Sequence, residues 1–294
     1  MKCRQHAGIV QFALTLSVVA GRPSRAGAQA APQWRFRDRG AGVPASMFGT
    51  YIGRGQLLVF PAFAYSSDHN REYQPAQLGF GLAQDFGGQY RSSEGQIFVG
   101  YGVTDRLAVE FEAGVIHVSL DKASNDPSGM PTRIEASGLA DMEGQLRLRL
   151  ASETARFPEV FSYLEVTAPS HRRDPLIGDR IWDVRPGVGV VRGFSWGTFT
   201  TRVTVEYNHD DRQWDLGEFS IEYLKRLSPS WRLNLAIEGG ETGAPDEWDL
   251  VSGVRWRVLD FLFLKLDNAL GISSKATDWA PQIGLMMSFP PELQ

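Results

Sequence analysis

The chain has 294 residues, which is enough for one large domain or two small ones. Its 30 basic and 34 acidic residues give a net charge of −4, which argues against nucleic acid as a partner because phosphate binding needs a basic face. A mean hydropathy of −0.23, with no run of about 18 unbroken apolar residues, excludes a helical membrane protein, and the single cysteine, Cys3, excludes an internal disulfide.

The first thirty residues have the layout of a secretory signal peptide. Lys2 and Arg4 form a basic start, an apolar run follows over residues 7–20, and the small residues at 26–30 fit a cleavage site. The expected organisation is a signal peptide at 1–30, an N-terminal periplasmic segment at 31–54 and a folded barrel domain at 55–294.

Apolar and polar residues alternate almost without interruption over residues 56–289. Leu146 and Leu148, for example, share one face of a strand, and Arg147 and Arg149 share the other. A soluble antiparallel sandwich also alternates, but its strands average about five or six residues. About ten residues, tilted as in a membrane barrel, cover the apolar band of about 25 Å that such barrels present to lipid. The sequence therefore predicts an all-β fold, a transmembrane antiparallel up-and-down β-barrel.

The connections between the expected strands alternate between short and long. Outer-membrane barrels place short turns in the periplasm and long loops outside, so this order predicts twelve strands, an outer-membrane location and both termini in the periplasm. A further apolar stretch, Gln77–Leu82, is assigned to the first external loop because a crossing there would break the alternation. The expected strands cover approximately 56–66, 93–103, 107–119, 138–150, 158–168, 181–193, 197–208, 214–226, 230–240, 247–258, 261–271 and 279–289.

Tryptophans gather near the ends of the expected strands, as in the aromatic girdles of membrane barrels. Trp214 is the exception in phase, since the alternation of its strand puts it on the inward face. Either a β-bulge near this residue, which would return it to the outer face, or a different register of the strand would account for this exception. The outer interface is expected to hold Trp182, Trp214, Trp248 and Trp279, and the inner interface Trp196, Trp231 and Trp256.

Four short stretches resemble an outer-membrane family associated with meta-pathway phenol degradation, whose members are described as transporters. Val99–Val109 resembles the family's hairpin, Gly138–Met142 a strand opening, Tyr163–Pro169 a further strand, and Tyr207–Asn208 the end of a later strand. Two positions depart from the family's pattern: Ala140 stands in place of a glycine, and no glycine follows Pro169 in Pro169-Ser170-His171. The resemblance spans about residues 55–289. It implies a small barrel that moves hydrophobic or aromatic compounds, and it supplies no catalytic residues.

Few residue patterns indicate catalysis or metal binding. His117 and Ser119 lie two apart on one expected strand, as in outer-membrane phospholipases, but Leu120 interrupts the signature that would follow. The five histidines show no metal-ligand spacing, so no metal or other cofactor is expected. We expect no enzyme, and a membrane lipid hydrolase is the third alternative.

Charged residues occupy the inward face of the expected barrel. They would form either a satisfied salt-bridge network that plugs the lumen or the wall of a selective channel, because buried charges must pair. The leading function is passage of a small, hydrophobic or aromatic solute, and the alternative is a non-transporting structural or surface-interaction barrel. Expected partners besides the solute are outer-membrane lipid, lipopolysaccharide and the outer-membrane assembly machinery. The expected channel-lining residues are Asp141, Glu143, Arg147, Arg149, Asp183, Arg185, Arg202, Glu206, Glu222, Arg255, Arg257 and Lys265.

Overall fold

A computed structural model describes residues 38, 52–169, 176–177, 182–208, 213–240 and 247–289. Its regular structure consists of β-strands joined by turns and loops. The strands are β1 (Leu57–Tyr73), β2 (Phe86–Gly102), β3 (Leu107–Asp121), β4 (Arg133–Leu139), β5 (Met142–Ala151), β6 (Glu159–Ala168), β7 (Asp183–Phe194), β8 (Gly197–Asn208), β9 (Gln213–Arg226), β10 (Trp231–Gly239), β11 (Trp248–Leu259), β12 (Leu262–Gly271) and β13 (Trp279–Phe289).

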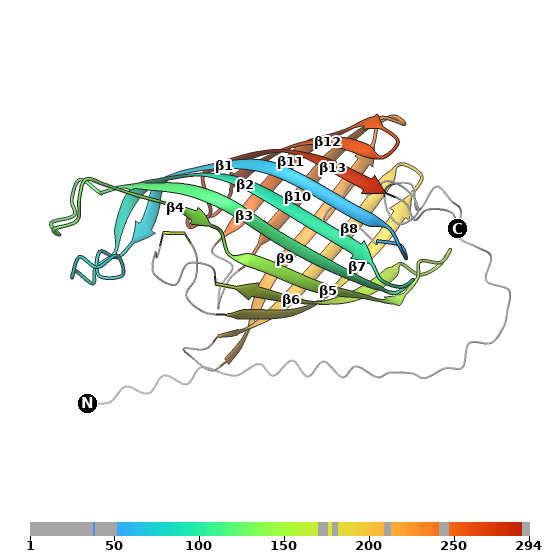
Figure 1. Ribbon diagram of the computed structural model, residues 1–294, viewed down its shortest axis with the longest axis horizontal. Coiled ribbons are helices and arrows are strands. Elements are labelled where there is room, and N and C mark those ends of the chain that lie inside the picture. The colour runs from blue at the N-terminus through green and yellow to red at the C-terminus, as the bar shows by residue number, and fades with distance from the viewer. Residues whose placement is uncertain are drawn as a thin grey trace.

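The strands form one closed antiparallel barrel (Figure 1). Except for β4 and β5, each strand pairs with the next along the chain, and β1 pairs with β13, so the sheet has no free end around its circumference. β4 and β5 both pair with β3, one after the other along its length, and therefore share one place in the wall. The barrel thus has twelve strand positions, as the alternation of connections predicts.

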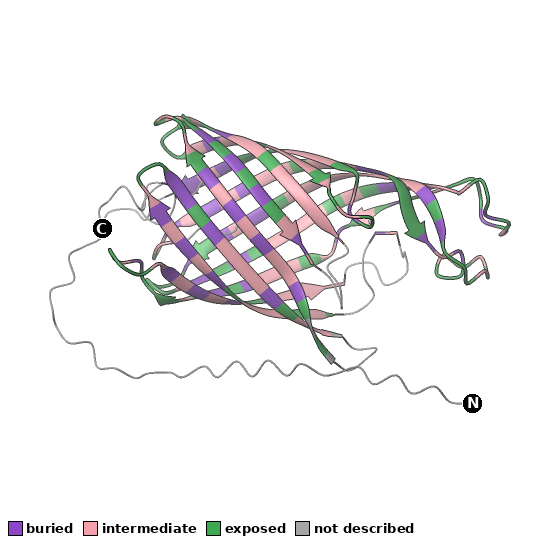
Figure 2. Cartoon of the chain, turned by 180° about the vertical axis from the view of Figure 1, so that it is seen from behind, coloured by how far each residue is buried: buried purple, intermediate pink, exposed green. Residues whose placement is uncertain are grey.

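Residues alternate between the two sides of the wall along most of the strands, which gives the banded pattern on several strands of Figure 2. The outward side chains are large, apolar and exposed, with Val115 at 60%, Leu146 at 50% and Leu235 at 48%. In water such a surface would be unstable, whereas in a lipid bilayer it is solvated by acyl chains. The predicted fold class, an antiparallel barrel with a lipid-facing exterior, is confirmed.

Short turns and longer connections leave the strands at opposite ends of the barrel. One end carries short connections such as Ser195–Trp196 and Asp260–Phe261, and it is called the turn end below. The other end carries longer connections such as 122–132 and 272–278, and it is called the loop end. The alternation read from the sequence is confirmed. In the described part of the chain, no helix is long and apolar enough to span a membrane.

The first four strands project beyond the others at the loop end (Figure 1). The sequence predicted a loop over 67–92, but β1 continues to Tyr73 and β2 begins at Phe86. An apolar cluster accounts for the difference, because Tyr73, Phe86, Leu120 and Met130 bury one another on one side of this extension. Gln77–Leu82 lies in the hairpin connection at its tip, as expected.

The expected strand over 138–150 is interrupted at Ala140 and Asp141. Leu139 and Met142 both point outward, so the two residues between them form an irregularity that reverses the phase of the alternation. The Ala140 N–H donates to the carbonyl of Gly114 on β3 at 2.9 Å, which keeps the interruption attached to the wall. The prediction of one continuous strand here was wrong.

A second irregularity lies between β8 and β9. The pairing shifts between Val203 and Val205, opposite Gly217 and Glu218, and beyond this point Trp214 stands on the outward face, 61% exposed. The bulge expected from the phase of this tryptophan is confirmed. The expected signal peptide at 1–30 lies outside the described residues, as does most of the segment 31–54.

Candidate functional site

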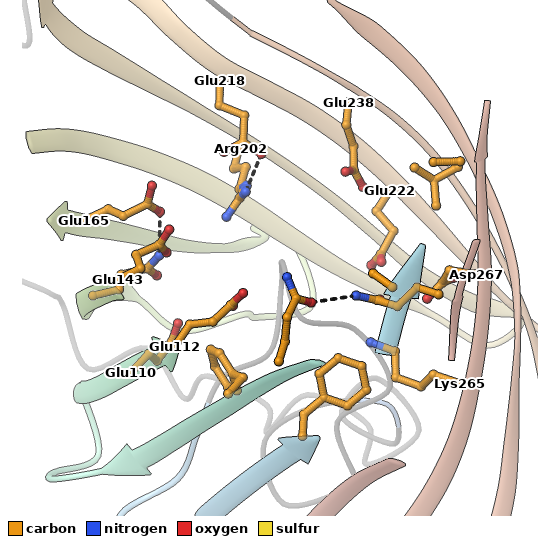
Figure 3. Close-up of a pocket in the computed structure, with 18 of the residues that line it drawn as sticks. Glu110, Glu112, Glu143, Glu165, Arg202, Glu218, Glu222, Glu238, Lys265 and Asp267 are labelled. Atoms are coloured by element: carbon orange, nitrogen blue, oxygen red, sulfur yellow. Dashed lines mark hydrogen bonds and ion pairs between the residues drawn. The ribbon is translucent and has the colours of Figure 1, made fainter. Parts of the chain in front are cut away.

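A cavity of about 430 Å³ lies inside the barrel (Figure 3). Charged and amide side chains share its wall with a few apolar ones, and eight carboxylates outnumber five cations there. The charged residues are Glu110, Glu112, Glu143, Glu165, Glu218, Glu222, Glu238, Asp267, Arg147, Arg185, Arg202, Arg255 and Lys265.

One part of the wall is a chain of paired groups on β3, β5, β6 and β7. Arg147 Nη2 lies 3.3 Å from Glu110 Oε2, and both side chains are about 95% buried. Gln145 accepts from Arg147 at 3.1 Å and donates to Glu165, also at 3.1 Å. Glu165 then pairs with Arg185 Nη1 at 3.3 Å. Because each charged group of this chain has an opposite charge or an amide beside it, the groups of the chain are electrostatically satisfied.

Arg202 on β8 forms a separate pair with Glu218 of β9. Its guanidinium also lies 5.8 Å from the ring centre of Tyr163, within the range of a cation–π contact. The Tyr163 ring has space because Gly187 is its neighbour on β7, where an added Cβ would lie 2.4 Å from the ring. A small residue on one strand therefore lets the ring lie along the wall.

A second group of pairs stands on β9 to β12. Arg255 binds Asp267 across β11 and β12, and Gly253 leaves room for this pair, since a Cβ there would lie 2.0 Å from Asp267 Oδ1. With its amide turned to satisfy both neighbours, Asn234 donates to Glu222 and accepts from Arg255. The acids nearest to this part of the wall are thereby engaged.

Lys265 lies beside this group and differs from it. It is 3% exposed and lines the cavity, and its ammonium lies 4.6 Å from the ring centre of Phe60. In the described residues, no ion pair or hydrogen bond joins its Nζ to another side chain or carbonyl. Lys265 therefore presents three N–H donors to the cavity beside an aromatic face.

Three carboxylates also face the cavity without a cation within 4 Å in the described residues: Glu112 on β3, Glu143 on β5 and Glu238 on β10. Figure 3 shows Glu112 and Glu143 across the cavity from Lys265. Such groups need water or a solute to replace the hydration they lose in a dry interior. The cavity is thus polar along these walls.

The turn end of the lumen is closed by an apolar cluster. Leu58, Phe60, Phe98 and Phe263 point inward there and are buried, and Ile52, which precedes the first strand, packs among them. The sequence around β1 is apolar on both of its faces, which is the signal of a strand buried on both sides. The floor of the cavity is therefore hydrophobic.

Asp38 lies still closer to the turn end. Its carboxylate binds Arg226 of β9 and accepts from Arg232 Nε of β10 at 2.7 Å, and the residue is 2% exposed. Arg232 also lies over the ring of Phe263 at 4.9 Å, so the pair joins the apolar floor. A residue of the N-terminal segment is thus fixed inside the barrel.

The structure brings seven of the predicted residues to the cavity and leaves five elsewhere. Glu143, Arg147, Arg185, Arg202, Glu222, Arg255 and Lys265 line it. The other five lie on the inward face or near the rims of the barrel, but above or below the cavity along the barrel axis. Alternation predicts which face of a strand a residue occupies and not its position along the axis. Arg149 binds the Asp105 carbonyl, Arg257 lies 3.8 Å from Asp260, Asp183 binds Arg185, Asp141 lies in the interruption before β5, and Glu206 lines a smaller cavity of about 250 Å³.

The expected channel-lining residues did not include the inward aromatic residues or six carboxylates of the cavity wall: Glu110, Glu112, Glu165, Glu218, Glu238 and Asp267. The bulge in β9 hides Glu218, because its phase follows from the pairing with β8. Phe60 and Phe98 alternate with apolar outward neighbours and so give no polar signal. Glu238 could have been found, since it continues the inward series of Arg232 and Asn234.

The structure places His117 and Ser119 on the outward face of β3, away from the cavity. His117 Nδ1 lies 2.7 Å from Ser137 Oγ on β4, so its partner is the cross-strand neighbour. Ser119 lies between Arg91 and Glu135 in the sheet. This arrangement provides a hydrogen bond across the outer face of the extension and gives no support to a nucleophile–base pair.

Comparisons with known proteins agree with the fold. No family model matches the chain, and no curated protein matches its sequence. A crystal structure of an outer membrane channel from Pseudomonas putida F1 is similar with a TM-score of 0.57 at 14% identity, covering 84% of this chain and 99% of that one. Two further barrels are more distant: the β domain of the Bordetella autotransporter BrkA, with a TM-score of 0.46, 12% identity and coverage of 79% and 99%, and a mutant of the monoaromatic hydrocarbon channel TodX, with a TM-score of 0.40, 10% identity and coverage of 80% and 90%. At this level of identity, the likeness to the Pseudomonas structure establishes that the chain has the fold of an outer-membrane β-barrel.

Proposed function

We propose that the protein resides in a bacterial outer membrane and lets small hydrophobic or aromatic solutes pass through its barrel. The observation that carries the proposal is the cavity of about 430 Å³ enclosed by a closed barrel with an apolar exterior. Eight-stranded barrels are filled by side chains and sixteen-stranded ones hold open pores, so twelve strand positions allow a narrow chamber.

The lining supports an apolar solute. Phe60 and Phe98 contribute aromatic surface, and Ala64, Ala269 and Ala280 contribute small apolar side chains that leave room beside them. Below them the floor is hydrophobic down to Ile52. An apolar body can therefore contact apolar side chains on the wall and on the floor of the cavity.

Transport is tested by uptake into liposomes that contain the purified protein. We expect faster entry of small aromatic compounds than into protein-free liposomes. Folding is checked by the shift in gel mobility that heat causes in membrane barrels. A folded protein that gives no uptake of any small solute would contradict the proposal.

A non-transporting structural barrel is the second candidate, and the closed turn end favours it. Asp38 and the apolar cluster together fill the lumen there. Under this alternative, removal of Asp38 would weaken the fold and leave the permeability of liposomes unchanged. The two candidates therefore differ in the behaviour of the same variant.

A further inference from the structure

Lys265 is the one cation on the wall of the main cavity, among the residues described, that no side chain neutralises within 4 Å. Its neighbours in register explain why. Arg255 on β11 faces it directly and holds Asp267, and Gly284 on β13 faces it from the other side. The acid closest along its own strand is thus already bound to another cation.

The position of the ammonium is built rather than accidental. Gly284 makes space for the Phe60 ring, since an added Cβ would lie 2.3 Å from that ring. The ring in turn supports Lys265 Nζ at 4.6 Å. Packing therefore holds the ammonium against an aromatic face, and a cation–π contact leaves the N–H donors available for an oxygen acceptor.

The surroundings of Lys265 indicate the class of molecule that would use those donors. Ala269 lies on the same face of β12, and Ala280 and Ala64 face the cavity from β13 and β1. These small apolar side chains leave space for a hydrocarbon body next to the ammonium. The eight carboxylates against five cations around the cavity oppose an anion there.

We propose that Lys265 is a solute-binding residue that donates a hydrogen bond to the oxygen of a small, uncharged, otherwise apolar solute. This inference rests on the proposed function and narrows it, because it names alcohols and carbonyl compounds in preference to plain hydrocarbons. A hydrocarbon that displaces water from the cavity leaves the ammonium without a hydrogen-bond acceptor. The site should therefore bind a hydrocarbon more weakly than a solute that carries an acceptor oxygen.

Four probes with one carbon skeleton test the proposal: toluene, benzyl alcohol, benzoate and benzylammonium. Binding is measured by isothermal titration of the full-length protein in detergent micelles, with the titration of protein-free micelles subtracted. We expect benzyl alcohol to bind at least about ten-fold more tightly than toluene and more tightly than either ion. In Lys265→Met the preference for benzyl alcohol over toluene should disappear, and in Lys265→Arg it should persist.

The matched control is Lys225→Met, the same substitution on the exposed outer face of β9. It should leave the order of the four probes unchanged. Equal binding of toluene and benzyl alcohol to the wild type, tighter binding of benzoate, or a preference that survives in folded Lys265→Met would each overturn the proposal.

Uptake into liposomes separates this inference from the proposed function. Binding that depends on Lys265 without uptake would contradict transport and leave the role of Lys265 standing. Uptake of benzyl alcohol without any dependence of binding on Lys265 would support transport and contradict the role of Lys265.

Discussion

Leu146 and Leu150 stand on the outward face of β5 at different depths, Leu146 toward mid-strand and Leu150 beside the turn end. Leu146→Arg places a charge in the acyl-chain region and should lower the free energy of unfolding by about 2–4 kcal/mol. Leu150→Arg, whose side chain can reach the interface, should cost about 0–1 kcal/mol. Urea unfolding in liposomes measures both, and equal tolerance of the two substitutions would show that this face does not contact lipid.

Asp38 joins the N-terminal segment to the barrel through Arg226 and Arg232. Asp38→Ala leaves two buried guanidinium groups without their acid, which should destabilise the protein by about 3–5 kcal/mol. It should also raise the single-channel conductance in planar bilayers, because Asp38 would no longer hold Arg226 and Arg232 in place at the turn end of the lumen.

The double variant Asp38→Ala with Arg232→Ala is the control for that experiment. Its destabilisation should be smaller than the sum of the two single effects, since the residues are in contact. A folded Asp38→Ala protein with unchanged conductance would favour the non-transporting barrel.

At the scale of an element, the extension formed by β1 to β4 depends on its own apolar cluster. Leu120 is 1% exposed among Tyr73, Phe86 and Met130. Leu120→Ala should destabilise the extension by about 2–5 kcal/mol and speed proteolysis in the connection 122–132. The gel mobility of the barrel should remain that of the folded state. Loss of the whole barrel with this substitution would mean that the extension and the barrel unfold as one unit.

The connection between β12 and β13 is tied to β1 by one acid. The backbone N–H of His69 donates to Asp278 Oδ2 at 2.9 Å, and its ring lies 2.7 Å from the same oxygen. These hydrogen bonds, first from the backbone and then from the ring, hold the pKa of Asp278 below its ordinary value of 3.8. Their contribution is therefore present above about pH 4 and is lost as the pH falls through the lowered pKa.

Limited proteolysis of the connection 272–278 checks this expectation. Cleavage should accelerate as the pH falls below 3.8, with an acid-tolerant protease. Asp278→Asn should give the faster cleavage already at neutral pH. Equal cleavage rates of the wild type and Asp278→Asn at neutral pH would show that the contact between His69 and Asp278 does not hold the connection 272–278 in place.

At the scale of the whole molecule, we propose an orientation in the membrane with the turn end in the periplasm and the loop end outside the cell. The connection that contains Ser128 lies at the loop end, and Ser228 lies in a turn at the other end. An epitope tag at Ser128 should bind antibody on intact cells, while a tag at Ser228 should bind only after the outer membrane is opened. The reverse pattern would invert the proposed orientation.

The period of two was sufficient to predict the outward face, because that depends only on which side of a strand a residue occupies. The barrel also needed the length of the strands and the alternation of short and long connections. It was insufficient where pairing decides the answer. The length of β1 beyond Ser66 depends on the cluster around Leu120, and the interruption at Ala140 depends on its bond to Gly114. The site shows the same limit of the sequence pattern. Arg149 is on the predicted face, but it binds the Asp105 carbonyl at the turn end and does not line the cavity.

The width of the lumen depends on residues that contribute almost nothing to its surface. Phe161 lies flat against the wall because Gly189 stands beside it, and Tyr163 and Phe60 have Gly187 and Gly284 in the same role. The position of each aromatic ring therefore depends on the glycine beside it, and we expect the two residues to change together in evolution. A chain that replaced the glycine alone would turn the ring toward the axis and narrow the bore without altering a single charge. Related barrels whose lumens differ in width should accordingly differ at both the aromatic residue and its glycine.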